Sequence, residues 1–332
     1  MNLMTQKLSN YFLTLIIICF GFSLTMEKSY AADDNIKFAI ISDHKGDYVG
    51  LQNVLIFIAE QQVDFILVPG DYEPLKKAYQ DYYTKMGFVV SRDNEPDMQD
   101  VYYMIGNHDN PSSGSDFYQG MIAPYYPANG PNDAPRGTIY SFDRGNAHFV
   151  ATNQYWNYGS GGYTDEQLRW IEGDLQSSQQ PFKFVFGHEP AFPLDRHVGD
   201  SLDADPEMRD EFWKMLADNG VQAFFCGHTH HLSIVKDQGV YQIDTGEVAA
   251  SHITVVIVEI NDAGAIARLY ETEGEIPEAV DNPFNTSLEN GDTGDQQYEV
   301  VFDSGITHPE SSSSNGCIIQ TLTHSLITKR TH

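Results

Sequence analysis

The stretch Ile105-Gly106-Asn107-His108-Asp109 presents an amide, an imidazole and a carboxylate in succession, directly after a glycine. It closes the apolar run 101–105, and an uninterrupted apolar run of this length predicts a buried strand. In open α/β sheets, ligands bind beyond the carboxyl ends of the strands. We therefore expect these polar side chains to lie where a ligand would be held.

Four other strand-like runs end in the same way, each followed by a side chain that can bind a metal. Run 36–42 leads to Asp43, run 65–68 to Gly70-Asp71, run 182–186 to Gly187-His188, and run 222–226 to Gly227-His228-Thr229-His230. Five strand ends of this kind indicate a repeated design, in which several loops contribute to one site.

The length and composition of the chain predict one large folded domain with appendages. The chain has 332 residues, of which 41% are hydrophobic and 12% aromatic, enough for a sizeable core. Its formal net charge is -28, from 47 acidic and 19 basic residues. The negative electrostatic field of such a chain repels nucleic acid duplexes and anionic membrane surfaces. An anionic substrate would then require a strong local positive centre, such as bound metal ions.

The N-terminus has the pattern of a secretory signal. Lys7 precedes the apolar run 12–22, and Ser29-Tyr30-Ala31 has small residues at the spacing of a cleavage site. The alternative is a membrane anchor, but the run is shorter than the roughly 20 residues that a span needs. We expect residues 1–31 to be removed, leaving a secreted or periplasmic protein without a stable membrane span. Three cysteines do not make a disulfide framework.

The remaining chain predicts an α/β domain at 32–273 and an acidic, Ser-rich, weakly ordered extension at 274–332, with one possible edge strand at 298–302. Within the domain, a strand, a helix at 50–60 and a second strand form the unit of a mostly parallel sheet. Further expected elements are helices at 75–86, 164–176 and 206–217, a hairpin at 138–152, and antiparallel strands between 232 and 271. Segment 110–135, rich in Gly, Pro and Asn, is expected to be a long loop beside the substrate.

The strand ends carry six residues of the kinds that bind metals: Asp43, Asp71, Asn107, His188, His228 and His230. Carboxylate, amide and imidazole ligands suit Zn²⁺, Mn²⁺ and Fe, and less often Mg²⁺. Six ligands are too many for one tetrahedral site and suit two open sites that leave room for water. We therefore expect two divalent or trivalent ions.

Such a pair of ions favours phosphoryl transfer. Two metals about 3.5–4 Å apart clamp the attacking and leaving oxygens and lower the pKa of a bridging water. His108 would lie over the same point, stabilise the developing charge and protonate the leaving alkoxide. Asp109 would orient His108.

The five motifs, in this order and spacing, resemble those of the calcineurin-like metallophosphoesterase superfamily, over residues 36–272. Segments 138–143 and 166–170 are also similar to secreted purple acid phosphatases. The resemblance implies an α/β fold built as a four-layer αββα sandwich of two mixed β-sheets flanked by helices, a dinuclear metal site and hydrolysis of a phosphate ester. It assigns Asp43 and His230 to the first metal, Asn107, His188 and His228 to the second, Asp71 to both, and His108 as the acid.

One departure from the family pattern concerns the first metal. The superfamily usually has His two residues after the first Asp, where this chain has Lys45; purple acid phosphatases use a Tyr three residues after the Gly-Asp aspartate, where this chain has Pro74. Three alternatives remain open. His44 reaches the metal, or water completes its shell while Lys45 contacts the substrate phosphate as a point charge, or the first site is degenerate.

The sequence thus predicts an exported metallophosphoesterase that hydrolyses phosphomonoesters or nucleotides, with Lys45, Asn107 and His108 contacting the phosphate. A phosphodiesterase acting on cyclic nucleotides or other diesters is one alternative. A catalytically impaired metal- or phosphate-binding protein is the other. His197, His231 and His252 fit no ligand position and are expected to be structural, and the sequence carries no signal of oligomeric state.

Overall fold

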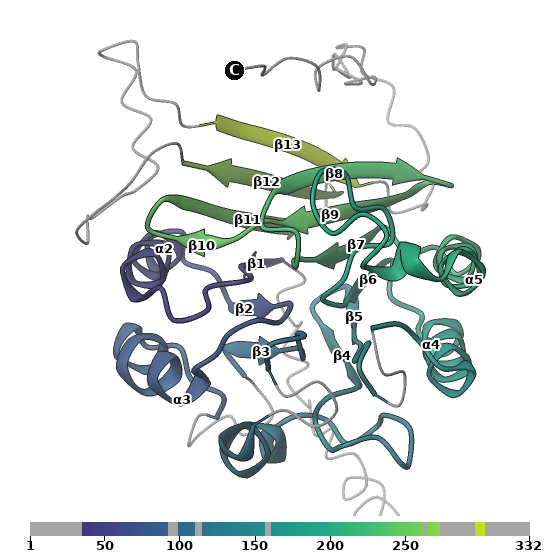
Figure 1. Cartoon of the computed structure of the whole chain (residues 1–332), viewed down its shortest axis with the longest axis horizontal. Coiled ribbons are helices and arrows are strands. Elements are labelled where there is room, and N and C mark those ends of the chain that lie inside the picture. The colour runs from purple at the N-terminus through teal and green to yellow at the C-terminus, as the bar shows by residue number, and fades with distance from the viewer. Residues whose placement is uncertain are drawn as a thin grey trace, which may run out of the picture.

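Two β-sheets lie face to face at the centre of the molecule, with helices on their outer sides (Figure 1). The computed structural model describes residues 35–91, 99–109, 115–156, 161–261, 264–272 and 296–302. The predicted signal at 1–31 and most of the predicted extension at 274–332 lie outside these ranges.

The first sheet has the strand order β13-β12-β11-β1-β2-β3, with β10 paired to β11. Strands β1 (Ile36–Ile40), β2 (Phe65–Val68) and β3 (Val101–Tyr103) run parallel to one another. The antiparallel part consists of β10 (Val248–Ala249), β11 (His252–Asn261), β12 (Gly264–Glu271) and β13 (Gln296–Phe302). The edge strand expected at 298–302 is thus confirmed. It pairs antiparallel with β12 at the edge of the first sheet, and its Val300 and Phe302 side chains are buried.

The second sheet has the order β4-β5-β6-β7-β9-β8. Strands β5 (Ala147–Ala151), β6 (Phe182–Phe186), β7 (Ala223–Cys226) and β9 (Val240–Thr245) are parallel, whereas β4 (Tyr140–Arg144) and β8 (Leu232–Asp237) pair antiparallel at the two edges. Both sheets are therefore mixed, as the family resemblance implied.

Helices cover each sheet from outside. Helix α2 (Tyr48–Glu60) and a helical segment that begins as α3 (Leu75–Ala78) and continues to Met86 lie beside the first sheet (Figure 1). Helices α4 (Asp165–Ser177) and α5 (Pro206–Asp218) lie beside the second. This arrangement confirms the αββα sandwich. Among the described helices, none has both the length and the apolar character that crossing a bilayer requires.

Helix α4 begins close to the predicted position. The Thr164 side chain accepts a hydrogen bond from the Gln167 backbone N–H, which is an N-cap contact. The buried Gln167 side chain bonds the backbone N–H and C=O of Asn153 at 3.0 and 2.9 Å, and so ties the start of the helix to the loop after β5.

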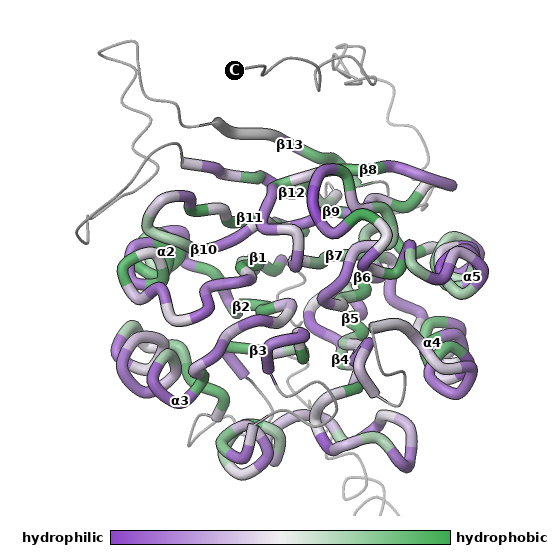
Figure 2. Tube along the Cα trace, in the orientation of Figure 1, coloured by the Kyte–Doolittle hydropathy of each residue, from purple (hydrophilic) through white to green (hydrophobic). Residues whose placement is uncertain are grey.

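The core between the sheets is aromatic. Phe38 of β1 stacks on Phe65 of β2 at 5.1 Å between ring centroids, and meets Phe149 of β5 and Phe184 of β6 edge-on at 5.2 and 5.9 Å. All four rings are fully buried. Figure 2 shows the corresponding concentration of hydrophobic residues along the central strands, whereas the outer helices carry both hydrophobic and hydrophilic residues. The aromatic contacts lock the two sheets together and so fix the relative position of their strand ends.

The segment expected to be a long loop is more ordered than predicted. Residues 118–122 form a π-helical turn and 123–125 a 3₁₀ turn. The Tyr118 hydroxyl donates to the Tyr103 carbonyl at 3.1 Å, and the Tyr126 hydroxyl to the Val101 carbonyl at 2.7 Å. Buried tyrosines therefore bind this segment to β3, which hydrophobic periodicity alone does not reveal.

Candidate metal centre

Three predicted ligands from both sheets converge at the strand ends. Asp43 follows β1, Asp71 follows β2 and His188 follows β6. One ligand atom from each lies within 4.8 Å of the others, and all three residues are buried. Buried carboxylates are costly unless a positive charge or donor compensates them. The cluster is therefore a candidate cation site in the described part of the chain.

The backbone at these strand ends is strained. Asp43, Asp71, His228 and His230 have φ values of 55°, 54°, 72° and 64°, in the left-handed region that non-glycine residues rarely adopt. Each such residue costs on the order of 1–3 kcal/mol and persists only where the surroundings impose it. Strain of this kind, concentrated on the predicted ligands, is typical of a functional site.

Glycines allow the loops to approach closely. A Cβ atom on Gly106 would lie 2.3 Å from Asp71 Oδ1, and one on Gly227 would lie 2.3 Å from Asp43 Oδ2. On Gly70, whose φ is +96°, it would lie 2.6 Å from His188 Nδ1. Gly70, Gly106 and Gly227 of the sequence motifs therefore each make room for a predicted ligand from another loop.

His188 is oriented as a ligand would be. Its Nδ1 lies 2.7 Å from the Pro69 carbonyl and donates to it, so Nε2 faces the cluster, 3.0 Å from Asn107 Oδ1 and 3.5 Å from Asp71 Oδ1. A backbone carbonyl on the outer ring nitrogen is the usual support of a metal-binding histidine. Burial lowers the pKa of His188, but Asp71 and Asp43 outweigh it and raise the pKa to about 10. Without a metal, a proton thus supplies the positive charge.

The Asn107 amide lies between Asp71 and His188. Its inner terminal atom is 3.2 Å from each Asp71 carboxylate oxygen and 3.0 Å from His188 Nε2. When no ion is bound, the amide satisfies these neighbours with its NH₂ group inward, where it donates to Asp71. Turned with its oxygen inward, it completes a set of amide, carboxylate and imidazole donors that suits a metal ion. Asn107, Asp71 and His188 are therefore near enough to one another, and of the right kinds, to hold one ion.

His228 lies on the same side of the site. Its backbone N–H donates to Asp43 Oδ2 at 2.9 Å, and its ring lies 5.0 Å from that of His188 between centroids. Burial, with His188 and His197, lowers the pKa of His228 to about 3, so the ring is neutral and able to bind a metal. The His197 ring packs 4.0 Å from that of His228. His197 was expected to be structural; its sequence position gave no signal of this contact.

Lys45 lies among the ligands predicted for the first metal. Its Nζ is 2.8 Å from Asp71 Oδ2, 3.7 Å from Asp43 Oδ1 and 2.9 Å from His230 Nε2. The other nitrogen of His230, Nδ1, contacts Glu247 at 2.8 Å. The place that the family resemblance assigns to the first metal therefore already contains the Lys45 ammonium. In this arrangement Asp43, Asp71 and His230 do not fit a metal ion there as well.

Neither His44 nor Pro74 supplies the missing ligand. His44 is 1% exposed, its ring lies 6.1 Å from that of Tyr83, and neither ring nitrogen has a hydrogen-bond partner in the described part of the chain. It is not part of the converging cluster. Pro74 lies beside Gly46 and has no side-chain donor.

Asp109 has a different role from the one predicted. Its carboxylate accepts hydrogen bonds from the backbone N–H groups of Asp71, Tyr72 and Gly106 at 2.6, 3.1 and 2.9 Å. Among the described contacts none joins it to His108, because the carboxylate points inward and His108 is exposed. Burial and Asp71 raise the pKa of Asp109 to about 8, although these N–H bonds favour the anion. Asp109 holds two ligand loops together.

His108 lies exposed at the rim of the cluster, next to Asn107. Its backbone N–H donates to Asp71 Oδ1 at 3.0 Å, which fixes the loop but leaves the imidazole directed outward. Glu189, which the sequence analysis missed, follows His188 in the chain; its Oε1 accepts from the Tyr155 hydroxyl at 2.8 Å, and the Tyr155 ring lies 6.3 Å from that of His188 between centroids. Burial raises the pKa of Glu189 to about 7. Only its position after His188 in the sequence could have drawn attention to it.

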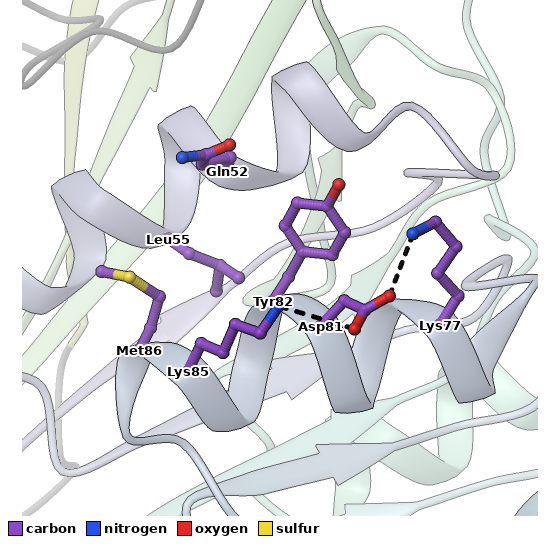
Figure 3. A pocket seen from close by; sticks show the side chains of 7 residues that line it. All are labelled: Gln52, Leu55, Lys77, Asp81, Tyr82, Lys85 and Met86. Carbon is purple, nitrogen blue, oxygen red and sulfur yellow. Dashed lines mark hydrogen bonds and ion pairs between the residues drawn. The ribbon is translucent and has the colours of Figure 1, made fainter.

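A surface hollow elsewhere has no such chemistry. It lies between α2 and the helical segment after α3 and is lined by Gln52, Leu55, Lys77, Asp81, Tyr82, Lys85 and Met86 (Figure 3). Both of its lysines pair with Asp81, at 2.9 and 3.5 Å. The hollow contains none of the predicted site residues, so the strand ends remain the candidate site.

Two curated proteins match short parts of this chain. A segment of 98 residues is 31% identical to a probable inactive purple acid phosphatase 9 of Arabidopsis thaliana, covering 29% of this chain and 14% of that protein. A segment of 72 residues is 31% identical to human tartrate-resistant acid phosphatase type 5, covering 22% of this chain and 21% of that protein. The matches therefore span far less than two thirds of these relatives.

The structure of the purple acid phosphatase PPD1 from yellow lupin (Lupinus luteus) seeds has a TM-score of 0.50 to this chain. The two are 15% identical, and the likeness covers 76% of this chain and 57% of that one, so it shows a shared fold. The sequence model of the calcineurin-like phosphoesterases matches residues 36–232, more than half of the chain and all of the strand ends described above. This chain therefore belongs to the calcineurin-like phosphoesterase family.

Proposed function

We propose that this protein is an exported, metal-dependent phosphoesterase that hydrolyses phosphomonoesters or nucleotides. The observation that carries the proposal is the convergence of the buried Asp43, Asp71 and His188 at the strand ends, with the Asn107 amide 3.2 Å from the Asp71 carboxylate. The family match adds support, since it spans the same residues.

One metal ion would be held by Asp71, Asn107, His188 and His228. The oxygen and nitrogen donors of these residues suit Fe, Zn²⁺ or Mn²⁺. When bound there, the metal would supply Lewis-acid charge and a water of lowered pKa. The Asp109 carboxylate, which accepts hydrogen bonds from three backbone N–H groups, would hold the Asp71 and Gly106 loops together. The Tyr155 ring, fixed by its hydrogen bond to Glu189, would support the His188 ring.

The remaining steps belong to residues at the rim. His108, exposed beside Asn107, would donate a proton to the oxygen that leaves phosphorus, a role worth typically 10²–10⁴-fold in rate. The Lys45 ammonium and the Asn107 amide would contact the phosphate oxygens. These positive groups would make the site locally attractive to a phosphate in a chain whose formal net charge is -28.

The predicted signal at 1–31 supports export to the periplasm or outside the cell, where a phosphomonoesterase would release phosphate from small molecules. A second candidate is a metal- or phosphate-binding protein with impaired catalysis. Lys45 favours it, because its Nζ lies 2.8 Å from a carboxylate that the family resemblance assigns to both metals.

Turnover separates the candidates. The purified chain, without residues 1–31, is assayed with p-nitrophenyl phosphate and bis-p-nitrophenyl phosphate, before and after chelation and after addition of Mn²⁺ or Zn²⁺. We expect metal-dependent turnover of the monoester that falls 10²–10⁴-fold in His108→Ala. His231→Ala, which removes an exposed imidazole from a nearby loop, is the matched control and should retain activity.

Faster turnover of the diester would favour the phosphodiesterase alternative. Metal binding without turnover of either ester would favour the impaired binding protein. Turnover that is insensitive to chelation, or full activity in His108→Ala, would contradict the proposed function.

A further inference from the structure

We propose that the Lys45 ammonium takes the place of one of the two metal ions that the family resemblance implies. The chain would then bind a single ion, next to a cation supplied by its own side chain. The inference rests on the proposed metal-dependent function, but it concerns how many ions bind and where.

The contacts of Lys45 are those expected of a bound cation. Nζ lies 2.8 Å from Asp71 Oδ2 and 3.7 Å from Asp43 Oδ1, and it contacts His230 Nε2 at 2.9 Å. These are the three residues that the resemblance assigns to the first metal. Both carboxylates are fully buried, whereas the Lys45 side chain is 29% exposed and so reaches the site from its open side.

The backbone directs Lys45 into this position. Its φ of 32° lies in the left-handed region, and its N–H donates to the Asp71 carbonyl at 3.2 Å. Gly46, with a φ of +79°, turns the chain away against Pro74. The loop after β1 therefore folds back over the strand end and is bound to the loop after β2, so that the long side chain returns to Asp71.

His230 is arranged to accept a hydrogen bond from the ammonium. Its Nδ1 lies 2.8 Å from Glu247 Oε2, and Glu247 is itself contacted by His252. A hydrogen on Nδ1 that is donated to Glu247 leaves a lone pair on Nε2, which faces Nζ. A metal would need this same lone pair, so an ion in the first position would have to displace Lys45.

Charge balance also favours one ion. Asp43 and Asp71 bring two negative charges, which Lys45 and a single divalent ion more than neutralise. A second divalent ion would place two further charges beside an ammonium in a mostly buried site, where like charges repel strongly. Lys45 reaches Asp71 through Oδ2, whereas Asp71 Oδ1 and the Asn107 amide face His188 Nε2 at 3.5 and 3.0 Å, so this other side of the cluster stays available. Asp71 would thus lie between the ammonium and the ion.

Metal stoichiometry tests the inference without reference to catalysis. The chain from residue 32 to 332 is first stripped of metal with a chelator and then titrated with Mn²⁺. Unbound metal is removed on a desalting column, and the bound metal is measured. We expect one equivalent for the unmodified chain and two for Lys45→Met, which keeps the length of the side chain but frees Asp43, Asp71 Oδ2 and His230. The control Lys77→Met, at a lysine half exposed on the surface, should bind one.

A spectroscopic measurement on the unmodified chain guards against a variant that misfolds. The chain is loaded with excess Mn²⁺ and then desalted, and its electron paramagnetic resonance spectrum is recorded. An isolated Mn²⁺ ion gives a six-line signal, whereas two ions about 3.5–4 Å apart are magnetically coupled. We expect the isolated signal. Two equivalents or a coupled signal in the unmodified chain would overturn the inference while leaving the proposed function intact. One equivalent in a folded Lys45→Met would also overturn it, and no bound metal would contradict both proposals.

Discussion

Replacing Gly106 by alanine should displace Asp71 and weaken metal binding. The added Cβ would lie 2.3 Å from Asp71 Oδ1, 2.4 Å from the Asp71 backbone nitrogen and 3.0 Å from Asp109 Oδ2. Ordinary contacts begin at 3.4 Å, so the carboxylate would have to retreat by 3.4 − 2.3 = 1.1 Å. Backbone lies on the same side, and the strand end therefore cannot absorb the clash by rotating one side chain.

The structure sets the expected magnitudes. Overpacking of this kind costs about 1–3 kcal/mol in the free energy of unfolding. A displacement of about 1 Å at a catalytic group costs on the order of 10²-fold in rate. We expect Gly106→Ala to raise the dissociation constant for Mn²⁺ about 10–100-fold, as loss of the support of a ligand does. Turnover of p-nitrophenyl phosphate should fall about 10²-fold at saturating metal.

Isothermal titration with Mn²⁺, urea unfolding and the turnover assay check these values. Gly173→Ala is the matched control, because Gly173 lies in α4 and an added Cβ there meets nothing within 4 Å. The control should gain about 0.5–1 kcal/mol of stability from helix propensity and leave metal affinity unchanged. If Gly106→Ala binds Mn²⁺ and unfolds as the unmodified chain does, the close packing of the ligand loops is refuted.

Two further predictions concern the framework. Phe38→Ala should lower the free energy of unfolding by about 3–5 kcal/mol, because the ring is fully buried between the sheets; a loss below about 1 kcal/mol in urea unfolding would show that the core is not packed as described. His148 lies 2.6 Å from Asp143 and 2.8 Å from Asp174; burial lowers its pKa, but the two carboxylates outweigh burial and raise it. A raised folded-state pKa gives stability that is fully present below the unfolded pKa of about 6.5 and lost as pH rises through the folded pKa. His148→Gln should therefore cost more stability at about pH 6 than at about pH 9, and an equal cost at both would contradict the ion pairs.

The strands and the main ligands could be predicted because their signal is local. Apolar runs such as 65–68 and 182–186 coincide with β2 and β6, since a buried strand needs no turn chemistry inside it. Asp71 and Asn107 come after the parallel strands β2 and β3, whose carboxyl ends lie at one edge of the first sheet. His188 follows β6 of the second sheet and meets them because the two sheets pack face to face.

The contacts that were missed depend on backbone direction and on distant packing. The position of Lys45 over Asp71 requires a left-handed φ, which its sequence does not encode by itself. Asp109 was expected to face His108 because the two are neighbours, yet it turns inward to three backbone N–H groups. His197 reaches His228 from a loop that carries no regular pattern. The edge strand at 298–302 was predicted, but its pairing partner β12 was not, because the two are far apart in the sequence.

The most direct test of a metal-binding site at the strand ends is a crystal structure of the Mn²⁺-loaded chain with an anomalous difference map. We expect a peak within coordination distance of His188 Nε2, Asn107 Oδ1 and Asp71 Oδ1, with Lys45 Nζ still against Asp71 Oδ2. An anomalous map with no peak at these atoms, or with the only strong peak far from them, would contradict it.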